Sequence, residues 1–324
     1  MNQFTSNFAP LMEEMLVYKE SLGYARATYE SRLHDFDRFC LTHFPEESLL
    51  KKEMVLKWME KRPNESVQNL KVRGQIIRGL GQYLDSMGME AYILPEMFVG
   101  HSGRFTPYMF SDTELKAFFI AADGVASNTV DPGKSIVIPV IFRLIYTCGL
   151  RPNEGRELKR QNVNLDTGEI LITKTKRHKE RIVVLSDDML NLCRAYETRR
   201  NMIFPDSEYF FPCADGQAYS QRQLQREFIS CWIRANPGKS PNILPRVRVY
   251  DLRHRFASGI LNKWLDEKRN LSAMLPYLRA YMGHEKISST AYYIHLLPEN
   301  LIKSAGIDWS GFQGLIPEVD VWPE

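Results

Sequence analysis

The sequence predicts a mainly α-helical protein with a small β-hairpin, divided into an N-terminal helical domain and a larger, mixed α/β domain. Three observations support this prediction. Apolar residues recur at helical spacing through the first hundred residues. A polar, glycine-rich segment follows at residues 100–104, and further along two β-rich runs flank a basic turn. A chain of 324 residues fits two domains better than one, and its 44% hydrophobic content is ample for ordinary cores.

The overall composition permits a nucleic-acid partner without demanding one. A formal net charge of +3 is only mildly basic, so the distribution of charge matters more than its sum. The five cysteines are odd in number, far apart and mostly inside apolar runs, which predicts reduced core residues rather than a disulfide or a zinc site. The chain start has no signal-peptide pattern, and no stretch approaches the ~18 apolar residues of a membrane span. We therefore expect a soluble, cytoplasmic protein without a membrane partner.

Four helices are predicted in the N-terminal domain. Gly23 ends the first, Pro63 follows the third, and the fourth runs from about Ser66 to Ser86. Each is predicted from an apolar stripe: Leu11, Met15 and Tyr18; Tyr29, Leu33, Phe36 and Cys40; Met54, Val55 and Trp58; and Val67, Leu70, Ile77, Leu80 and Leu84.

The other face of the fourth helix is polar. It carries Lys71, Gln75, Arg78 and Gln82 one turn apart. This stripe could lie along a phosphate backbone, and a solvated helix face explains it equally well.

A domain boundary is predicted near residue 103. The segment 100–104 is short, polar and glycine-rich, as in a flexible joint. Ser111 and Glu114 then have the spacing of a capping box, so a new helix begins there. The two domains are expected at residues 1–103 and 104–324.

The second domain changes from helical to β periodicity and back. Residues 136–148 form a long apolar run that predicts a buried helix, which ends at Gly149. Two strands are predicted at residues 169–173 and 181–185, and a second capping box at Ser220 begins another helical region. The turn between the strands, residues 174–181, is the densest basic segment in the chain. Such a tip could enter a DNA groove or be a solvated hairpin end.

The segment 249–257 concentrates groups suited to phosphate binding. From Arg253 onward, apolar residues recur at helical spacing, which places Arg253 in the first turn of an amphipathic helix. An anion there could meet both the guanidinium and the helix N-terminus. The alternative is that Arg253 and Arg255 are solvated arginines on a surface helix.

Together these features resemble the tyrosine recombinase family, the integrases and site-specific recombinases related to phage lambda integrase. The resemblance covers the whole chain in outline and is most specific between Tyr146 and His295. The family's first arginine, in a Gly-Leu-Arg context with a glutamate three residues on, matches Arg151 and Glu154. Its hairpin lysine, ahead of Lys-Glu-Arg and an apolar strand, matches Lys176, with Lys174 as the other register.

The remaining family positions lie nearer the C-terminus. The second arginine, in Asp-Leu-Arg-His, matches Arg253, and the histidine of Met-Gly-His matches His284. The family's nucleophile lies nine positions beyond that histidine, which selects Tyr293 rather than Tyr292. One position departs from the pattern, because Tyr250 stands where the family usually has a histidine. A phenol is a poor proton acceptor near neutral pH, since its reference pKa is ~10.

These residue types suit phosphoryl transfer without a metal ion or other cofactor. Arg151 and Arg253 can clamp the non-bridging oxygens of a phosphodiester. Tyr293 can attack phosphorus and form a covalent phosphotyrosine. Lys176 can protonate the leaving 5′ oxygen, and His284 can donate to a non-bridging oxygen.

The resemblance implies a metal- and ATP-independent enzyme that cuts and rejoins double-stranded DNA at specific sites. It also implies a helical core-binding domain at 1–103, a catalytic domain at 104–324 and a homo-tetramer on paired sites, with a monomer or weak oligomer in the absence of DNA. The apolar, glycine- and proline-containing tail at about 306–324 is expected to dock on its own domain or a neighbouring protomer. Two alternatives remain open: DNA relaxation of the type IB topoisomerase kind, or a DNA-binding accessory protein with altered catalysis. The expected DNA-contacting residues are Lys71, Arg78, Lys174, Arg177 and Lys179.

Overall fold

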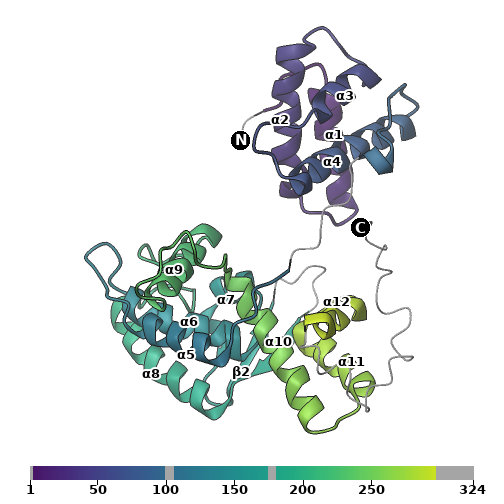
Figure 1. The fold of residues 1–324 in the computed structure, drawn as a ribbon. Helices are drawn as coiled ribbons and strands as arrows, with labels where there is room; N and C mark the ends of the chain where they lie inside the picture. The colour runs from purple at the N-terminus through teal and green to yellow at the C-terminus, as the bar shows by residue number, and fades with distance from the viewer. Residues whose placement is uncertain (1–2, 99–105, 174–179, 297–324) are drawn as a thin grey trace. The chain divides into compact units, whose positions relative to one another are not determined.

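The computed structural model describes residues 3–98, 106–173 and 180–296. The chain divides into two compact units, residues 1–105 and 106–324 (Figure 1). The described part is mostly helical with one small sheet, so the predicted fold class is confirmed. The glycine-rich segment 100–104 and the apolar tail 306–324 lie outside the described residues.

The first unit packs its helices around one apolar core that contains Met15, Phe36 and Trp58. The predicted helices are confirmed. Val67, which the sequence places in the core, is 41% exposed at the first position of its helix, where few neighbours cover it. The elements are α1 (Ala9–Ser21), α2 (Ala27–His43), α3 (Lys52–Met59), α4 (Val67–Ser86) and the 3-10 turn η1 (Glu96–Phe98).

The second unit contains the sheet and the remaining helices. The capping boxes predicted at Ser111 and Ser220 are both present. The two predicted strands pair antiparallel, and a two-residue strand too short to show a sequence pattern extends the sheet in the order β1-β2-β3. The elements are α5 (Asp112–Asp123), α6 (Lys134–Thr147), α7 (Pro152–Arg156), η2 (Arg160–Asn162), β1 (Val163–Asn164), β2 (Glu169–Ile172), β3 (Arg181–Val184), α8 (Asp187–Ile203), α9 (Gln221–Arg234), α10 (Val249–Asp266), α11 (Leu271–Met282), α12 (Ile287–Ala291) and η3 (Tyr292–Leu296).

Helix α10 lies between two apolar cores of this unit (Figure 1). Its first turn contributes Val249 and Leu252 to the larger core, which also takes in α5, α6, α8, α9 and the sheet. Its later turns contribute Ala257 and Leu261 to a smaller core shared with α11, α12 and η3. Arg253 lies between these two sets of core residues along α10 and is fully buried.

The prediction that Arg253 lies in the first turn of its helix is wrong. The helix begins at Val249, and the Asp251 carboxylate accepts the Arg248 backbone N–H at 2.8 Å as an N-terminal cap. Arg253 is thus in the second turn, beyond the free N–H groups that an anion could reach. Residues 247–250 read Val-Arg-Val-Tyr, a run of β-formers that hides the first helical turn in the sequence.

Gly149 marks a close approach between the loop after α6 and α10. Its backbone has φ +57°, and a Cβ there would lie 2.3 Å from a ring carbon of Phe256. Its carbonyl oxygen accepts a hydrogen bond from Arg253 Nη1 at 2.6 Å. The glycine therefore sets the position of a carbonyl that holds a buried guanidinium.

We expect Gly149→Ala to lower the free energy of unfolding by roughly 2–5 kcal/mol, since a left-handed alanine costs ~1–2 and overpacking against Phe256 costs ~1–3. Gly238→Ala is the matched control, because Gly238 has φ +82° and open space around the missing Cβ. This control variant should lose only the free energy that a left-handed alanine costs, without any clash. Urea unfolding of both variants measures the difference, and equal losses would contradict a packing role for the Gly149 contact.

Candidate functional site

The candidate site is built around the C-terminal end of α11. Gly283 adopts the left-handed conformation, and the backbone N–H groups of Gly283 and His284 donate to the carbonyls of Ala280 and Arg279, both at 3.0 Å. This is the hydrogen-bond pattern of a Schellman motif. It leaves the carbonyls of residues 281, 282 and 283 to find other donors.

Three arginines from three different elements satisfy those carbonyls. Arg181 at the start of β3 donates from Nε to the Tyr281 oxygen at 2.8 Å. On α10, Arg253 donates from Nη2 to the Met282 oxygen at 2.6 Å. Arg151, the residue before α7, donates from Nη2 to the Gly283 oxygen at 2.7 Å. Cations at the negative end of a helix dipole are favourably placed, so α11 gathers these guanidiniums at one point.

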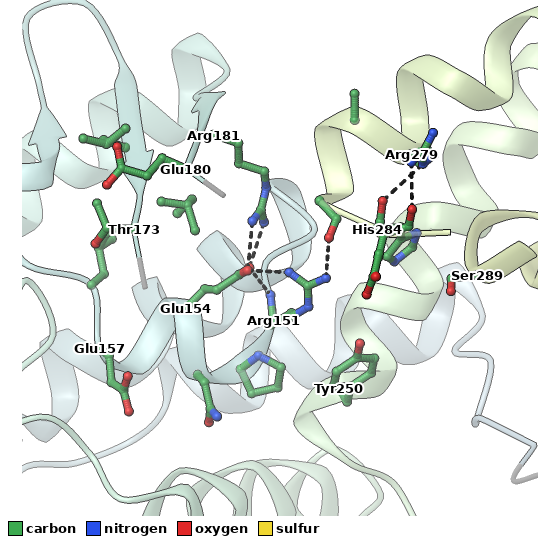
Figure 2. Close-up of a pocket in the computed structure, with 18 of the residues that line it drawn as sticks. Arg151, Glu154, Glu157, Thr173, Glu180, Arg181, Tyr250, Arg279, His284 and Ser289 are labelled. Carbon is green, nitrogen blue, oxygen red and sulfur yellow. Dashed lines mark hydrogen bonds and ion pairs between the residues drawn. The ribbon is translucent and has the colours of Figure 1, made fainter. Parts of the chain in front are cut away.

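Glu154 on α7 is the anion at the centre of this cluster (Figure 2). Its carboxylate accepts two hydrogen bonds from Arg181, at 2.9 and 2.8 Å, and two from Arg151, at 2.7 and 2.8 Å. Arg253 Nη1 lies 3.9 Å from it. Burial alone would raise the pKa of Glu154, but the hydrogen bonds and charges of Arg181 and Arg151 outweigh burial and lower this pKa to about 2.

Arg253 is fully buried, and it determines the proton state of His284. Arg253 Nη2 lies 3.0 Å from His284 Nε2, and a guanidinium can only donate, so Nε2 accepts. The proton of the neutral ring is then on Nδ1, 2.8 Å from the Thr290 hydroxyl oxygen, which accepts it. Burial and the charges of Arg253, Arg151 and Arg181 lower the pKa of His284 to about 3.

Tyr293 lies in η3 and is 2% exposed. Its ring stacks beside that of His284, with centroids 5.9 Å apart and an interplanar angle of 19°. Burial raises its pKa to about 12, although the nearby charge of Arg253 acts in the opposite direction. The neighbouring Tyr292 is half-buried.

His254 is a site residue that received no role from the sequence. Its ring lies 5.0 Å from that of Tyr250 and 5.5 Å from that of Tyr293, measured between centroids. Burial, with the charges of Arg248 and Arg253, lowers its pKa to about 4. His254 Nδ1 is buried and has no hydrogen-bond partner. The sequence signal was its place directly after Arg253, but helical spacing alone does not show that it lies between two tyrosines.

One pocket with a volume of about 1050 Å³ joins these groups. Its wall includes Arg151, Arg181, Tyr250 and His284 (Figure 2). His254 and Tyr293 also line it. Arg253 lies behind the wall, fully buried, and its Nε has no hydrogen-bond partner. Tertiary structure thus brings Arg151, Tyr250, Arg253, His284 and Tyr293, all selected from the sequence, to one place.

The other selected residues belong to two other parts of the chain. Lys174, Lys176, Arg177 and Lys179 lie outside the described residues. Lys71 and Arg78 belong to α4 in the first unit, where both are half-buried. Arg78 Nη1 donates to the Leu94 carbonyl, so one of its donors is already engaged.

All five cysteines are buried, as expected from their apolar surroundings. In the part of the chain that the structure describes, no group of three His, Cys, Asp or Glu side chains is arranged to hold a metal ion. The described helices include none that is both long and apolar enough to cross a membrane.

The low pKa of His284 gives a pH dependence of stability with a definite sign. Because its folded pKa of about 3 lies below the ordinary 6.5, the unfolded chain takes up the proton first. The contribution of His284 to the free energy of unfolding is therefore fully present above pH 6.5 and is lost as the pH falls toward 3. We expect His284→Gln, whose amide oxygen can still accept from Arg253, to lose less stability than the wild type between about pH 7.5 and about pH 5.

Urea unfolding at the two pH values measures this, with a single-group slope of at most ~1.4 kcal/mol per pH unit. His254 contributes in the same direction, so a smaller slope should remain in the variant. The lowered pKa of Glu154 changes the free energy of unfolding mainly below its ordinary pKa of 4.5, which lies under the pH range of this measurement. Equal slopes in wild type and His284→Gln would contradict the buried neutral state of His284.

Comparisons with known proteins identify relatives of this chain among the integrases and recombinases. The protein y4rE of Sinorhizobium fredii, whose name assigns it to the integrase/recombinases, is 27% identical over 303 residues, covering 91% of this chain and 93% of y4rE. Tyrosine recombinase XerD of Rhizobium meliloti is 32% identical over 176 residues, covering 54% of this chain and 52% of XerD.

Solved structures share the fold. XerH recombinase bound to a palindromic difH substrate superposes with a TM-score of 0.64 at 21% identity, covering 88% of this chain and 80% of XerH. A lambda integrase dimer on a core site gives a TM-score of 0.61 at 12% identity, covering 88% of this chain and 94% of that chain.

The family model described as "Phage integrase family" matches residues 125–300, more than half of the chain and all of the pocket wall. The chain therefore belongs to the phage integrase family and is a tyrosine recombinase.

Proposed function

We propose that this recombinase cuts and rejoins double-stranded DNA at specific sites through a covalent 3′-phosphotyrosine at Tyr293. The observation that carries the proposal is the meeting of two guanidiniums, an imidazole and a tyrosine at the end of α11, although they come from separate elements. Arg151 and Arg253 have fixed positions because backbone carbonyls and Glu154 hold them. Preorganised cations are what a transition state with growing negative charge requires.

The scissile phosphate is proposed to enter on the Arg151 side, where the arginine side chain is 31% exposed. Its non-bridging oxygens would take donors from Arg151 and compete with His284 for Arg253 Nη2. The arrival of an anion favours protonated imidazole, so His284 would take up a proton and donate from Nε2 to phosphate oxygen. The same ring would then change from acceptor to donor on binding DNA.

In the chemical step, Tyr293 Oη attacks phosphorus and the bond to the 5′ oxygen breaks. The products are a 3′-phosphotyrosine diester and a strand with a free 5′ hydroxyl, so a 5′ hydroxyl of another strand can reverse the reaction without ATP. Tyr293 is nearly inaccessible in the free protein, and attack therefore requires η3 to move when DNA binds. The described arrangement is proposed to be the resting state.

Two proton transfers accompany the reaction. We assign the proton for the leaving 5′ oxygen to Lys176 on the basic turn. The phenolic proton of Tyr293 leaves toward His254 and Tyr250 on α10. The His254 ring lies next to both the Tyr293 ring and the Tyr250 ring. Tyr250 replaces the usual histidine there, and the unpartnered His254 Nδ1 supplies an acceptor nitrogen that a phenol lacks.

DNA binding by both units is part of the proposal. Lys71 and Arg78 on α4, with Lys174, Arg177 and Lys179 of the basic turn, would contact the phosphate backbone, and such contacts are strongly salt-dependent. A lambda integrase tetramer has been solved on a Holliday junction, with a TM-score of 0.60 at 12% identity to this chain. We extend that assembly to this protein as a homo-tetramer on paired sites that forms from monomers or weak oligomers.

Tyr293→Phe should bind DNA but form no covalent adduct, because it removes only the attacking oxygen. The measurement uses a pool of duplexes with a nick beside each candidate cut, so that the short freed strand diffuses away and the adduct accumulates. Adducts are counted on denaturing gels and the captured duplexes sequenced. Tyr292→Phe is the matched control and should form the adduct.

An adduct in Tyr293→Phe that vanishes in Tyr292→Phe would move the nucleophile by one residue. Wild-type protein that binds DNA without any adduct would instead indicate an accessory protein. Relaxation of plasmids that lack paired sites, with no strand exchange between paired ones, would indicate topoisomerase activity.

Lys176→Ala should slow cleavage by roughly two orders of magnitude or more on an ordinary phosphodiester, the usual range for losing a general acid. A substrate with a 5′-thio leaving group should recover most of the rate, since a thiolate departs without a proton. Single-turnover cleavage of the two substrates provides the measurement, and Lys174→Ala tests the other register. Equal impairment on both substrates would remove Lys176 from the acid role.

A further inference from the structure

Arg181 has a place in the site that phosphate contact does not explain. Its side chain is 9% exposed, and both of its Nη atoms are used on Glu154 as a two-pronged ion pair. Its Nε donates to the Tyr281 carbonyl at the end of α11. All three nitrogens of the guanidinium thus donate to protein groups. An arginine that contacts a DNA phosphate would keep some of these donors free.

The charges around Glu154 show what Arg181 changes. Arg151 donates twice to this carboxylate, from its backbone and from Nη1, so without Arg181 the carboxylate would mainly balance Arg151. With Arg181 present, one buried negative charge faces three guanidiniums, counting Arg253 at 3.9 Å. The pair of Arg181 and Glu154 is neutral as a unit, and Arg151 and Arg253 keep two positive charges for an anion.

We propose that Arg181 is a positioning residue that offsets the Glu154 carboxylate and fixes the end of α11, so that Arg151 and Arg253 present uncompensated positive charge to the scissile phosphate. The inference rests on the proposed function and deepens it. Arg181 acts through Glu154 and the Tyr281 carbonyl, without contact to the reacting atoms. Lysine cannot replace it fully, because an ammonium keeps the charge but lacks the planar fork that spans both carboxylate oxygens.

The test compares single-turnover cleavage of two nicked duplexes of the sequence that the wild-type protein captures. One has the normal scissile phosphodiester, and the other has a neutral methylphosphonate at that position. Arg181→Gln should slow cleavage of the phosphodiester by roughly ten- to a hundredfold, less than the ~10²–10³ for removing a direct transition-state donor, because Arg181 acts through Glu154. On the methylphosphonate, which carries one negative charge fewer in the ground state and in the transition state, the loss should be smaller, at most about threefold.

Three further variants complete the design. Arg181→Lys should fall between wild type and Arg181→Gln on the phosphodiester. The double variant Glu154→Gln/Arg181→Gln removes one charge of each sign and should cleave faster than Arg181→Gln alone. Arg143→Gln is the matched control, since Arg143 makes the same two-pronged pair with Asp123 outside the pocket, at 2.6 and 2.7 Å, and it should cleave like wild type.

Parallel losses on both duplexes, wild-type rates in Arg181→Gln, or a double variant no faster than Arg181→Gln would each overturn the inference. If Arg181→Gln does not fold, Arg181→Lys and the double variant are judged by the ratio of the rates on the two duplexes, and an unchanged ratio in both overturns it equally. A wild-type protein that forms no adduct would overturn the proposed function instead, so the two failures are distinguishable.

Discussion

The site depends on the way α11 ends. A left-handed Gly283 closes the helix with two backbone hydrogen bonds and leaves three carbonyls exposed in the interior. Buried carbonyls without donors are costly, and here each one is satisfied by an arginine from a different part of the second unit. The same hydrogen bonds that complete the helix therefore bring Arg151, Arg181 and Arg253 within reach of one carboxylate and place His284 next to them.

The cluster of three arginines around Glu154 favours the binding of an anion more than it favours the stability of the fold. Three guanidiniums surround one carboxylate, and the desolvation of buried charges offsets much of their attraction. Burial lowers the pKa of Arg253, which shows that its charge is held at a cost. Burial, together with the positive charge of nearby arginines, lowers the pKa of His284 and of His254 and so keeps both rings neutral. We propose that a phosphate entering the pocket relieves this excess charge and so couples DNA binding to protonation of the pocket.

The position of α10 between two cores explains why the tyrosine and the guanidiniums meet. The larger core fixes the first turn of α10, and with it the orientation of Arg253 toward Gly149. Tyr293 belongs to the smaller core, with α11 and α12. The cationic cluster and Tyr293 thus lie next to two different apolar cores, and α10 contributes residues to both.

The sequence by itself determined the helical fold and the strand pair, because hydrophobic period is a local property. Its resemblance to the tyrosine recombinases selected Arg151, Tyr250, Arg253, His284 and Tyr293, which the structure brings together. The sequence placed Arg253 one turn too early and Val67 in the core, since propensity near a helix start is a weak signal. Only the tertiary structure decided that Arg181 pairs with Glu154, that His254 lies between two tyrosines and that His284 accepts from Arg253. Apart from the contact between His254 and Tyr250 within α10, these relations join residues 27–39 positions apart in different elements. Hydrogen bonding and burial between packed elements have no periodicity along the chain.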